Sequence, residues 1–159
     1  MEKRKISSAS YFRLLMILFG AMLMSQVAMA GVFVYLTISQ QIAEDPEMMS
    51  VMVFVVPVMA TSMIGLSFVV FSKLVNAAAE KSSLSDKLRG FQTATLLRMA
   101  LLEAPSLLAA VSIFLTGSTY FLVVNAVSIV FLALTIPRKE KVIELLRLTS
   151  PEIDLLNDP

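Results

Sequence analysis

Residues 104–137, APSLLAAVSIFLTGSTYFLVVNAVSIVFLALTIP, form a stretch of 34 residues without one charged side chain. This stretch decides the fold class, because uncharged apolar runs of about 18 or more residues predict membrane-spanning helices. It is too long for one span, and the small and hydroxyl residues at 116–119, around Gly117, are typical of a turn. Together with the residues just upstream, it predicts two helices, over 96–115 and 120–136, the second stopped by Pro137.

Two further uncharged runs lie towards the N-terminus, 30 residues at 14–43 and 25 residues at 48–72. They predict spans over 14–38 and 51–71. Charged residues make up only 16% of the chain, whereas soluble domains carry about 25%. We therefore expect an all-α membrane protein, with a four-transmembrane-helix bundle of two antiparallel hairpins over residues 1–137 and a short cytoplasmic amphipathic tail over 138–159.

The charges predict how the bundle is oriented. With these spans, all 13 Lys and Arg fall on one side of the membrane, whereas the loop between the first two spans carries only acidic residues, Glu44, Asp45 and Glu47. Because loops rich in Lys and Arg stay in the cytoplasm, we expect both termini to be cytoplasmic in a multi-pass protein of the cell inner membrane.

The N-terminal segment has a second interpretation. Its basic residues at 3–5, an apolar stretch and Ala28-Met29-Ala30 also match a cleavable signal peptide. The apolar run continues over 31–36, past that cleavage site, so the segment is long enough to span the membrane. An uncleaved signal anchor is therefore the favoured interpretation.

The composition removes several classes of chemistry. The chain has no Cys and no His, which excludes thiol catalysis, histidine-based acid–base catalysis and the usual zinc and haem sites. No phosphate-binding glycine loop is present, and the net charge of +1 does not indicate nucleic acid as a partner. We expect no enzyme activity, no cofactor and no metal site. The Cu(I) site that Met48, Met49 and Met52 would allow is a weak alternative to ordinary packing.

Glu103 is the one acidic residue inside a predicted span. A carboxylate there costs about 2.5–3.5 kcal/mol and is a functional-site hypothesis by default. Ser106 lies on its helix face, and small residues of the neighbouring spans at the same depth predict that the carboxylate is buried in the bundle: Gly20, Ala21, Gly65 and Ser67. Three roles stay open: a structural hydrogen bond or ion pair (with Arg98 or Arg13), a proton or ion pathway, and a contact with a partner.

Other residues in the spans indicate packing. Pro57 and Pro105 are predicted to kink their helices. Asn125 and Ser128, three residues apart, are predicted to form hydrogen bonds between helices. A stripe of small residues on the first span predicts a packing face, within the monomer or between copies: Ala21, Ser25, Ala28 and Gly31.

The cytoplasmic segments carry capping and amphipathic patterns. Residues 83–86, SLSD, match a capping box at the start of the third helix, and Pro151 is expected at the first position of a last short helix that follows Thr149. Apolar residues at helical spacing in the tail are expected to lie along the lipid headgroups: Val142, Ile143, Leu145, Leu146 and Leu148.

Several short motifs carry a resemblance to a known group. They are Arg98 followed by LLEAP at 101–105, LTG at 115–117, IPRKEK at 136–141, LRL at 146–148 and Glu152. With the two upstream spans, this pattern resembles a group of uncharacterised four-span inner-membrane proteins of Gram-negative bacteria. The resemblance implies the same topology and supplies no activity or cofactor.

Two main hypotheses about function follow. The first is a non-enzymatic accessory or assembly subunit that packs against a larger membrane complex or, as a homo-oligomer, against its own copies. The alternative is a small transporter or a proton or ion pathway centred on Glu103. For a third class, a membrane enzyme or sensor, the sequence contains no constellation of residues.

Overall fold

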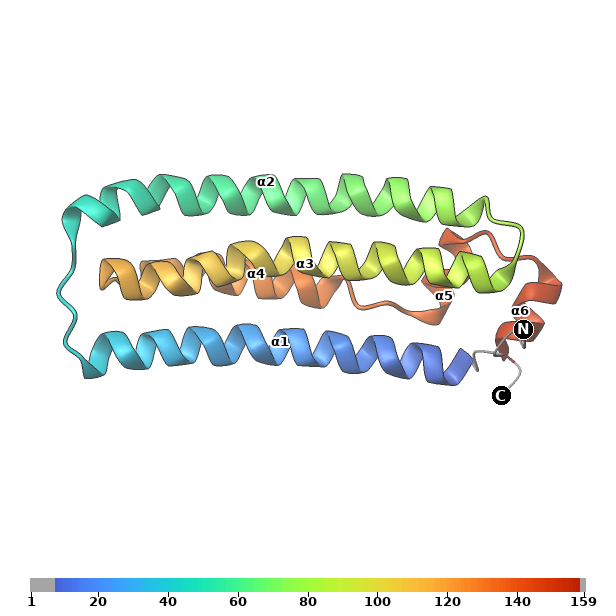
Figure 1. Cartoon of the computed structure of the whole chain (residues 1–159), viewed down its shortest axis with the longest axis horizontal. Helices are drawn as coiled ribbons and strands as arrows, with labels where there is room; N and C mark the ends of the chain where they lie inside the picture. The colour runs from blue at the N-terminus through green and yellow to red at the C-terminus, as the bar shows by residue number, and fades with distance from the viewer. Residues whose placement is uncertain (1–7, 158–159) are drawn as a thin grey trace, which may run out of the picture.

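The computed structural model describes residues 8–157, and this part of the chain is helical, with no strand. Its elements are α1 (Ser8–Ser39), α2 (Pro46–Ala79), α3 (Leu84–Thr116), the 3₁₀ helix η1 (Thr119–Phe121), α4 (Leu122–Leu134), α5 (Lys139–Leu145) and α6 (Ser150–Asn157). The four long elements run side by side, and α5 and α6 lie at the end of the bundle where α1 begins (Figure 1).

Helices α1, α2 and α3 are long and apolar enough to cross a membrane. The fourth predicted span, 120–136, corresponds to η1 and α4, which are long and apolar enough to cross only when α5 is counted with them, and α5 is bent from this segment by 75°. Helix α4 ends at Leu134, two residues before the predicted end. There the Thr135 backbone N–H and side-chain hydroxyl both donate to the Leu132 carbonyl (2.9 and 2.7 Å), and Pro137 disfavours a helical Ile136.

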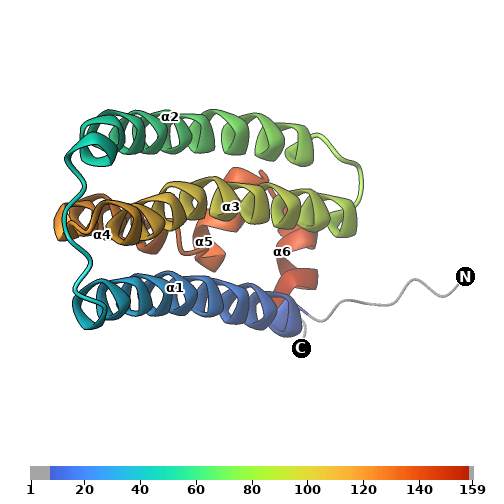
Figure 2. The same cartoon turned by 60° about the vertical axis from the view of Figure 1, so that its left-hand side comes forward.

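Helix α3 is the centre of the bundle. Helices α1 and α2 lie on opposite sides of it, and α4 packs behind it (Figures 1 and 2). The prediction of two hairpins is therefore wrong for the first pair, since α1 and α2 make few contacts with each other. The antiparallel pairs that pack are α2 with α3 and α3 with α4.

The loop between α1 and α2 explains this arrangement. Residues 40–45 cross the end of α3, where the Asp45 N–H donates to the Thr116 carbonyl (3.1 Å). Gly117 ends α3 with a φ of 69°, and a Cβ atom at this position would lie 2.6 Å from the Ala43 carbonyl oxygen. The loop thus rests on the backbone of the α3–η1 turn and holds α1 and α2 apart.

At the other end, α2 and α3 approach closely. A Cβ atom added to Gly90 would lie 2.5 Å from the Ala78 Cβ, so only glycine fits there. The Ser83 hydroxyl caps α3, accepting from the Asp86 N–H (3.2 Å) and donating to the Asp86 carboxylate (2.7 Å), as the capping pattern predicted. This turn places Lys81 of the α2–α3 loop at the end of the bundle that also holds the tail.

The C-terminal tail belongs to the packed structure. Val142 and Leu146 are fully buried and join a cluster with side chains of all three long helices: Tyr11, Leu15, Val75, Ala78, Leu88, Phe91 and Ala94. The expectation of a position along the headgroups is therefore wrong for Val142, Leu146 and Leu148, whereas Leu145 is exposed. Helices α1, α2 and α3 continue past the predicted spans, and the tail covers apolar side chains there. Burial of this apolar surface favours docking of the tail.

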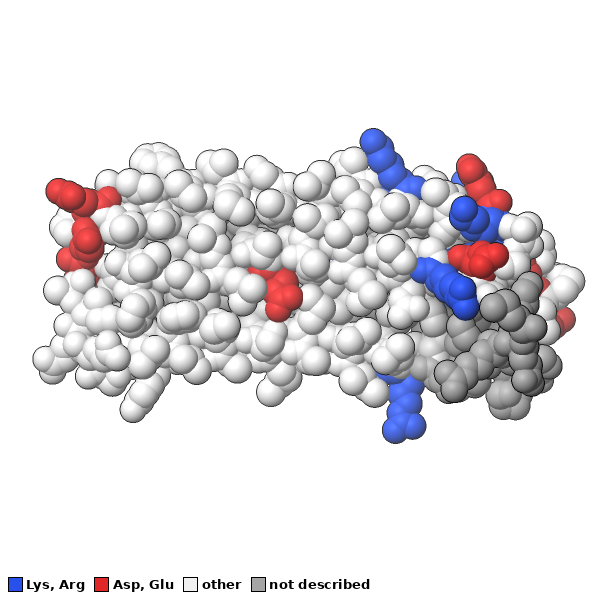
Figure 3. Space-filling model, in the orientation of Figure 1, with Lys and Arg blue, Asp and Glu red and all other residues white. Residues whose placement is uncertain are grey.

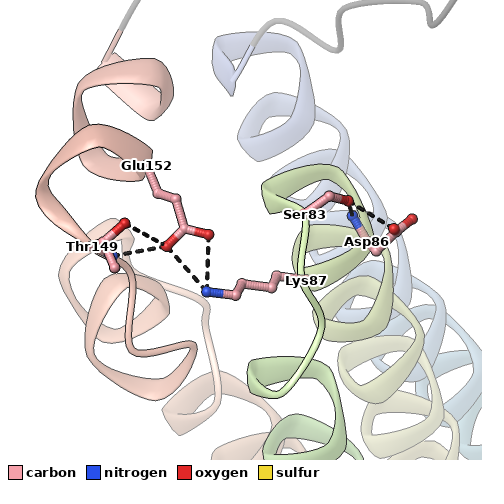
Figure 4. Close-up of polar contacts among 5 residues, drawn as sticks. All are labelled: Ser83, Asp86, Lys87, Thr149 and Glu152. Carbon is pink, nitrogen blue, oxygen red and sulfur yellow. Dashed lines mark hydrogen bonds and ion pairs between the residues drawn. The ribbon is translucent and has the colours of Figure 1, made fainter.

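Polar contacts add to the docking of the tail (Figure 4). Glu152 accepts from the Thr149 N–H (2.8 Å) and hydroxyl (3.0 Å), which caps α6, and its carboxylate pairs with Lys87 of α3 at 2.9 Å. Pro151 is the second residue of α6, not the first as predicted. The Thr149 N–H and Lys87 hold the pKa of the Glu152 carboxyl below its usual value.

Candidate functional site

Glu103 lies halfway along α3 and is half-buried. The Ser25 hydroxyl of α1, which also lies 2.8 Å from the Met22 carbonyl and shares its one proton between the two acceptors, contacts the Glu103 Oε1 atom (3.1 Å). This is the one polar contact that the described residues give the carboxylate. The predicted enclosure by small residues is wrong: Gly20 and Gly65 are exposed, with nothing within 4 Å of an added Cβ. Glu103 thus sits at the seam between α1 and α3, beside the exposed surface.

Arg98 does not reach Glu103. Its guanidinium lies over the rings of Phe68 (4.6 Å) and Phe71 (4.5 Å), both on α2, whereas Glu103 is hydrogen-bonded to α1. Arg98 makes no ion pair with any residue between 8 and 157. The two charges that sequence reasoning considered as partners therefore stay apart, on different sides of α3.

Asn125 and Ser106 link α4 to α3 inside the bundle. The Asn125 side-chain amide donates to the Ser106 hydroxyl (2.8 Å) and to the Ser106 carbonyl (3.2 Å), and both residues are buried. The predicted interhelical role is confirmed for Asn125. It is wrong for Ser128, whose hydroxyl donates to the Val124 carbonyl of its own helix (3.0 Å).

Gln26 is a polar residue that sequence reasoning missed. It is fully buried, and neither the oxygen nor the nitrogen of its amide has a hydrogen-bond partner within the part of the chain that the structure describes. It directly follows Ser25, so it lies at the depth of Glu103 but faces the inside of the bundle. Its signal in the sequence is a lone amide in an uncharged apolar run, which costs free energy unless it finds a partner.

The small-residue stripe of α1 is exposed along its whole length. Ala21, Ser25, Ala28 and Gly31 all face the outside of the bundle, and Gly31 has nothing within 4 Å of an added Cβ. On α3, Ala100 is exposed next to the half-buried Glu103. We call Ala21, Ser25, Ala28 and Gly31, together with Ala100 and Glu103, the open face.

The prolines leave their helices continuous. Pro57 lies inside α2 and Pro105 inside α3, and both helices continue past the proline without a break. Pro105 is buried in the central helix. Any bend at these positions therefore leaves the span in one piece.

The methionines at the start of α2 contribute to packing. Met49 and Met52 pack against the cluster of Val56, Ala109, Ile113 and Phe121, and the Ser112 hydroxyl contacts the Met52 sulfur (3.7 Å). Residues 8–157 contain no group of three or more acidic side chains that could hold a metal ion.

Charged side chains are distributed unevenly along the length of the bundle. In Figure 3, basic side chains gather in the half of the molecule where α1 begins, acidic side chains lie at both ends, and acidic atoms also appear midway along an otherwise uncharged length. Several apolar helices beneath this uncharged surface are the mark of a membrane-spanning protein.

A cavity of about 570 Å³ opens beside Arg98, at the break between α4 and α5. Its wall is mostly aromatic and aliphatic, and besides Arg98 it has five polar residues: Ser72, Thr95, Thr135, Lys141 and Glu144. The cavity exists because α4 stops at Leu134 and leaves this part of α3 uncovered.

Comparisons with protein-family models, with curated proteins and with solved structures each gave no match.

Proposed function

We propose that this chain is a non-enzymatic accessory subunit of a membrane complex, which docks a transmembrane helix of another protein on its open face. The proposal includes four membrane crossings with both termini in the cytoplasm of the inner membrane. The distribution of Lys and Arg supports this orientation, because they gather at the end where α1 begins and the tail docks.

The observation that carries the proposal is the position of Glu103. A carboxylate within a span costs about 2.5–3.5 kcal/mol by insertion scales, whereas one hydrogen bond between transmembrane helices contributes about 0.6 kcal/mol and at most about 1.7 kcal/mol. The Ser25 hydroxyl therefore offsets only part of the cost. A donor on a docked partner helix would supply the remainder.

The residues around Glu103 suit close helix packing. Transmembrane helices associate through small side chains that let their backbones approach, and the four small residues of the α1 stripe, Ser25 among them, are exposed. Gly31 also has free space around it, so packing within the monomer does not require a glycine at this position. A partner helix that packs on this stripe would make use of the close approach that its small side chains allow.

The arrangement of α3 supports the same proposal. Helices α1, α2 and α4 pack around α3 (Figure 2). On α3 itself, Ala100 is exposed and Glu103 is only half-buried. A fourth neighbour beside these two residues would complete the shell around the central helix.

The alternative function, an ion or proton pathway, needs a continuous polar route. Among the described residues, no hydrogen bond joins the pair of Ser25 and Glu103 to the pair of Asn125 and Ser106. This separation is why we favour the accessory role.

The test is a gentle purification followed by native mass spectrometry of the intact particle. We expect stoichiometric foreign subunits with the wild-type chain and their loss from the Gly31→Leu and Glu103→Gln variants. Gly65→Leu is the matched control, because Gly65 is also exposed on a long helix with free space around it but lies on α2. The control should retain the partner.

Other outcomes would contradict the proposal. A particle made only of copies of this chain would replace the accessory role with homo-oligomerisation. Proton or ion flux in liposomes that Glu103→Gln abolishes, in a particle of unchanged composition, would establish the pathway instead.

A further inference from the structure

Arg98 and Thr95 form an unsatisfied polar pair on one side of α3. The Thr95 side chain is 3% exposed, and its hydroxyl has no hydrogen-bond partner in the described part of the chain. The Arg98 residue is only partly buried, but its Nε atom is buried and has no acceptor within the described residues. Both residues line the same cavity of about 570 Å³. Three residues apart on a helix, they present their donors in the same direction.

An anion is the kind of ligand that would satisfy both polar groups. A buried guanidinium costs free energy unless it is paired, and a buried hydroxyl costs free energy unless it is hydrogen-bonded. Phe68 and Phe71 stabilise the cation through their ring faces. A ring face accepts no strong hydrogen bond from Nε, so the guanidinium edge stays available for a bidentate contact with phosphate or carboxylate.

The charges around the cavity mouth favour the same ligand. Lys141 and Glu144, both exposed on α5, also line the cavity. Counting Arg98, the lining has two basic side chains and one acidic side chain, so its net charge is positive. Glu144 forms no ion pair with Arg98 in the structure between residues 8 and 157.

The rest of the lining is apolar and extends to the surface. Met99, Phe91 and Phe131 form part of the wall, and at the rim Phe68, Leu134 and Leu145 are exposed, Leu134 by 71%. A small soluble anion would leave these side chains uncovered. An amphiphile covers them with its chain while its headgroup reaches Arg98.

The position of the cavity matches the depth of a headgroup. Arg98 lies near the cytoplasmic end of the predicted span over 96–115, where the basic residues begin. Arginine at such a depth commonly contacts the phosphates of the bilayer. The volume is in the range of ligand sites, about 300–1,000 Å³, and admits a headgroup with the upper part of an acyl chain.

We propose that this cavity binds the phosphate of an anionic phospholipid, held by the Arg98 guanidinium and the Thr95 hydroxyl, with an acyl chain leaving over Phe68 and Leu134. The site lies apart from the open face, so it stands independently of the accessory function. In this proposal, one phospholipid molecule is bound at a defined site, the break between α4 and α5.

The experiment measures lipid binding to the full chain in detergent by native mass spectrometry. The probes are dioleoyl phosphatidylglycerol, dioleoyl phosphatidylcholine as the zwitterionic lipid, and inorganic phosphate as the soluble source of the same group. We expect one phosphatidylglycerol to bind the wild type at least 10-fold more tightly than phosphatidylcholine, and millimolar phosphate to leave this binding unchanged.

The variants locate the site. Arg98→Gln should weaken phosphatidylglycerol binding roughly 10- to 100-fold, the effect expected of lost hydrogen bonds to a charged group. Arg98→Lys should give an intermediate loss, since it keeps the charge without the guanidinium fork. Thr95→Val, nearly isosteric, should cost about 3- to 10-fold. Arg89→Gln is the control, because Arg89 is exposed on the same helix and does not line the cavity.

Three results would overturn the proposal: equal binding by wild type and both Arg98 variants, equal binding of the two lipids, or displacement by inorganic phosphate, which would make the site one for soluble anions. If Arg98→Gln unfolds, Thr95→Val and Arg98→Lys decide alone, and unchanged binding by both contradicts the site.

Discussion

Lys87 and Glu152, 65 residues apart in sequence, form an ion pair of 2.9 Å that connects α3 to the C-terminal tail (Figure 4). The Lys87 residue is only 7% exposed, so its charge depends on this partner. The pair closes over an apolar cluster to which α1, α2, α3 and the tail all contribute. The tail is thus held by burial and by a specific electrostatic contact.

Removing Glu152 should release the tail. Glu152→Gln leaves the Lys87 charge buried and without its partner, which should destabilise docking by about 1.5–3 kcal/mol. The measurement is the rate of tryptic cleavage after Arg147, an exposed residue in the turn between α5 and α6. The rate should rise at least 10-fold. Asp154→Asn, an exposed carboxyl of the same helix, should leave it unchanged.

Docking of the tail should depend on pH. The pKa of the Glu152 carboxyl is lowered in the folded chain, so its contribution is fully present above the unfolded pKa of about 4.3 and is lost as pH falls through the lower folded pKa. The chain has no Cys, so single cysteines at exposed positions 89 and 155 can carry spin labels. We expect the label distance to increase only below about pH 4. A transition near neutral pH would contradict this assignment.

The contact between Gly90 and Ala78 should be sensitive to one methyl group. Gly90→Ala places a Cβ 2.5 Å from the Ala78 Cβ, so α2 and α3 must separate. Such overpacking should lower stability by about 1–3 kcal/mol, measured by thermal unfolding in detergent. Combining it with Ala78→Gly removes the clash and should restore most of the loss. A double variant as unstable as Gly90→Ala alone would contradict the contact.

Gly117 should not tolerate a side chain. Its φ of 69° and the nearby Ala43 carbonyl oxygen both oppose a Cβ atom, so Gly117→Ala should cost about 1–3 kcal/mol. In contrast, Gly65→Ala adds its methyl group to open space within a helix and should be neutral or stabilising by up to about 1 kcal/mol. Thermal unfolding of the two variants under the same conditions distinguishes these effects, and equal midpoints would refute the loop contact.

Asn125 and Ser128 should differ in their contribution to stability. Asn125→Ala removes hydrogen bonds between α4 and α3 and should cost about 0.6–1.7 kcal/mol. Ser128→Ala removes a bond within α4 only, and the cost should be close to zero. Denaturation in mixed micelles measures both, and a larger loss for Ser128→Ala would contradict the arrangement of the two side chains.

The residue pattern predicted the helices better than their arrangement. Uncharged runs identify apolar helices because the absence of charge over about 20 residues can be seen in the local sequence, and the cap at Ser83 follows from local spacing. Which helices pair depends on contacts distant in sequence, such as the approach of residue 43 to Gly117. No periodicity in the sequence contains that information.

The candidate site shows the same division. The cost of a carboxylate in a span identified Glu103 without a structure, but its side of α3 and its partner Ser25 depend on how α1 packs. The cavity beside Arg98 could not be foreseen, because it results from the end of α4 at Leu134 and the bend to α5. Gln26 was missed because one uncharged amide changes the hydropathy of its run very little.

The central position of α3 sets an order for assembly during synthesis. When α1 and α2 have left the ribosome, they have few contacts to make with each other, so the first half of the chain has no tertiary unit of its own. Packing between the helices can begin only once α3 has been synthesised. Its contact with α2 through Gly90 and Ala78 is then the first helix pair that can pack. Helix α1 is inserted first and packs only after α3 is in the membrane. Until then its buried amide, Gln26, and the stripe beside it are open to any other membrane helix nearby.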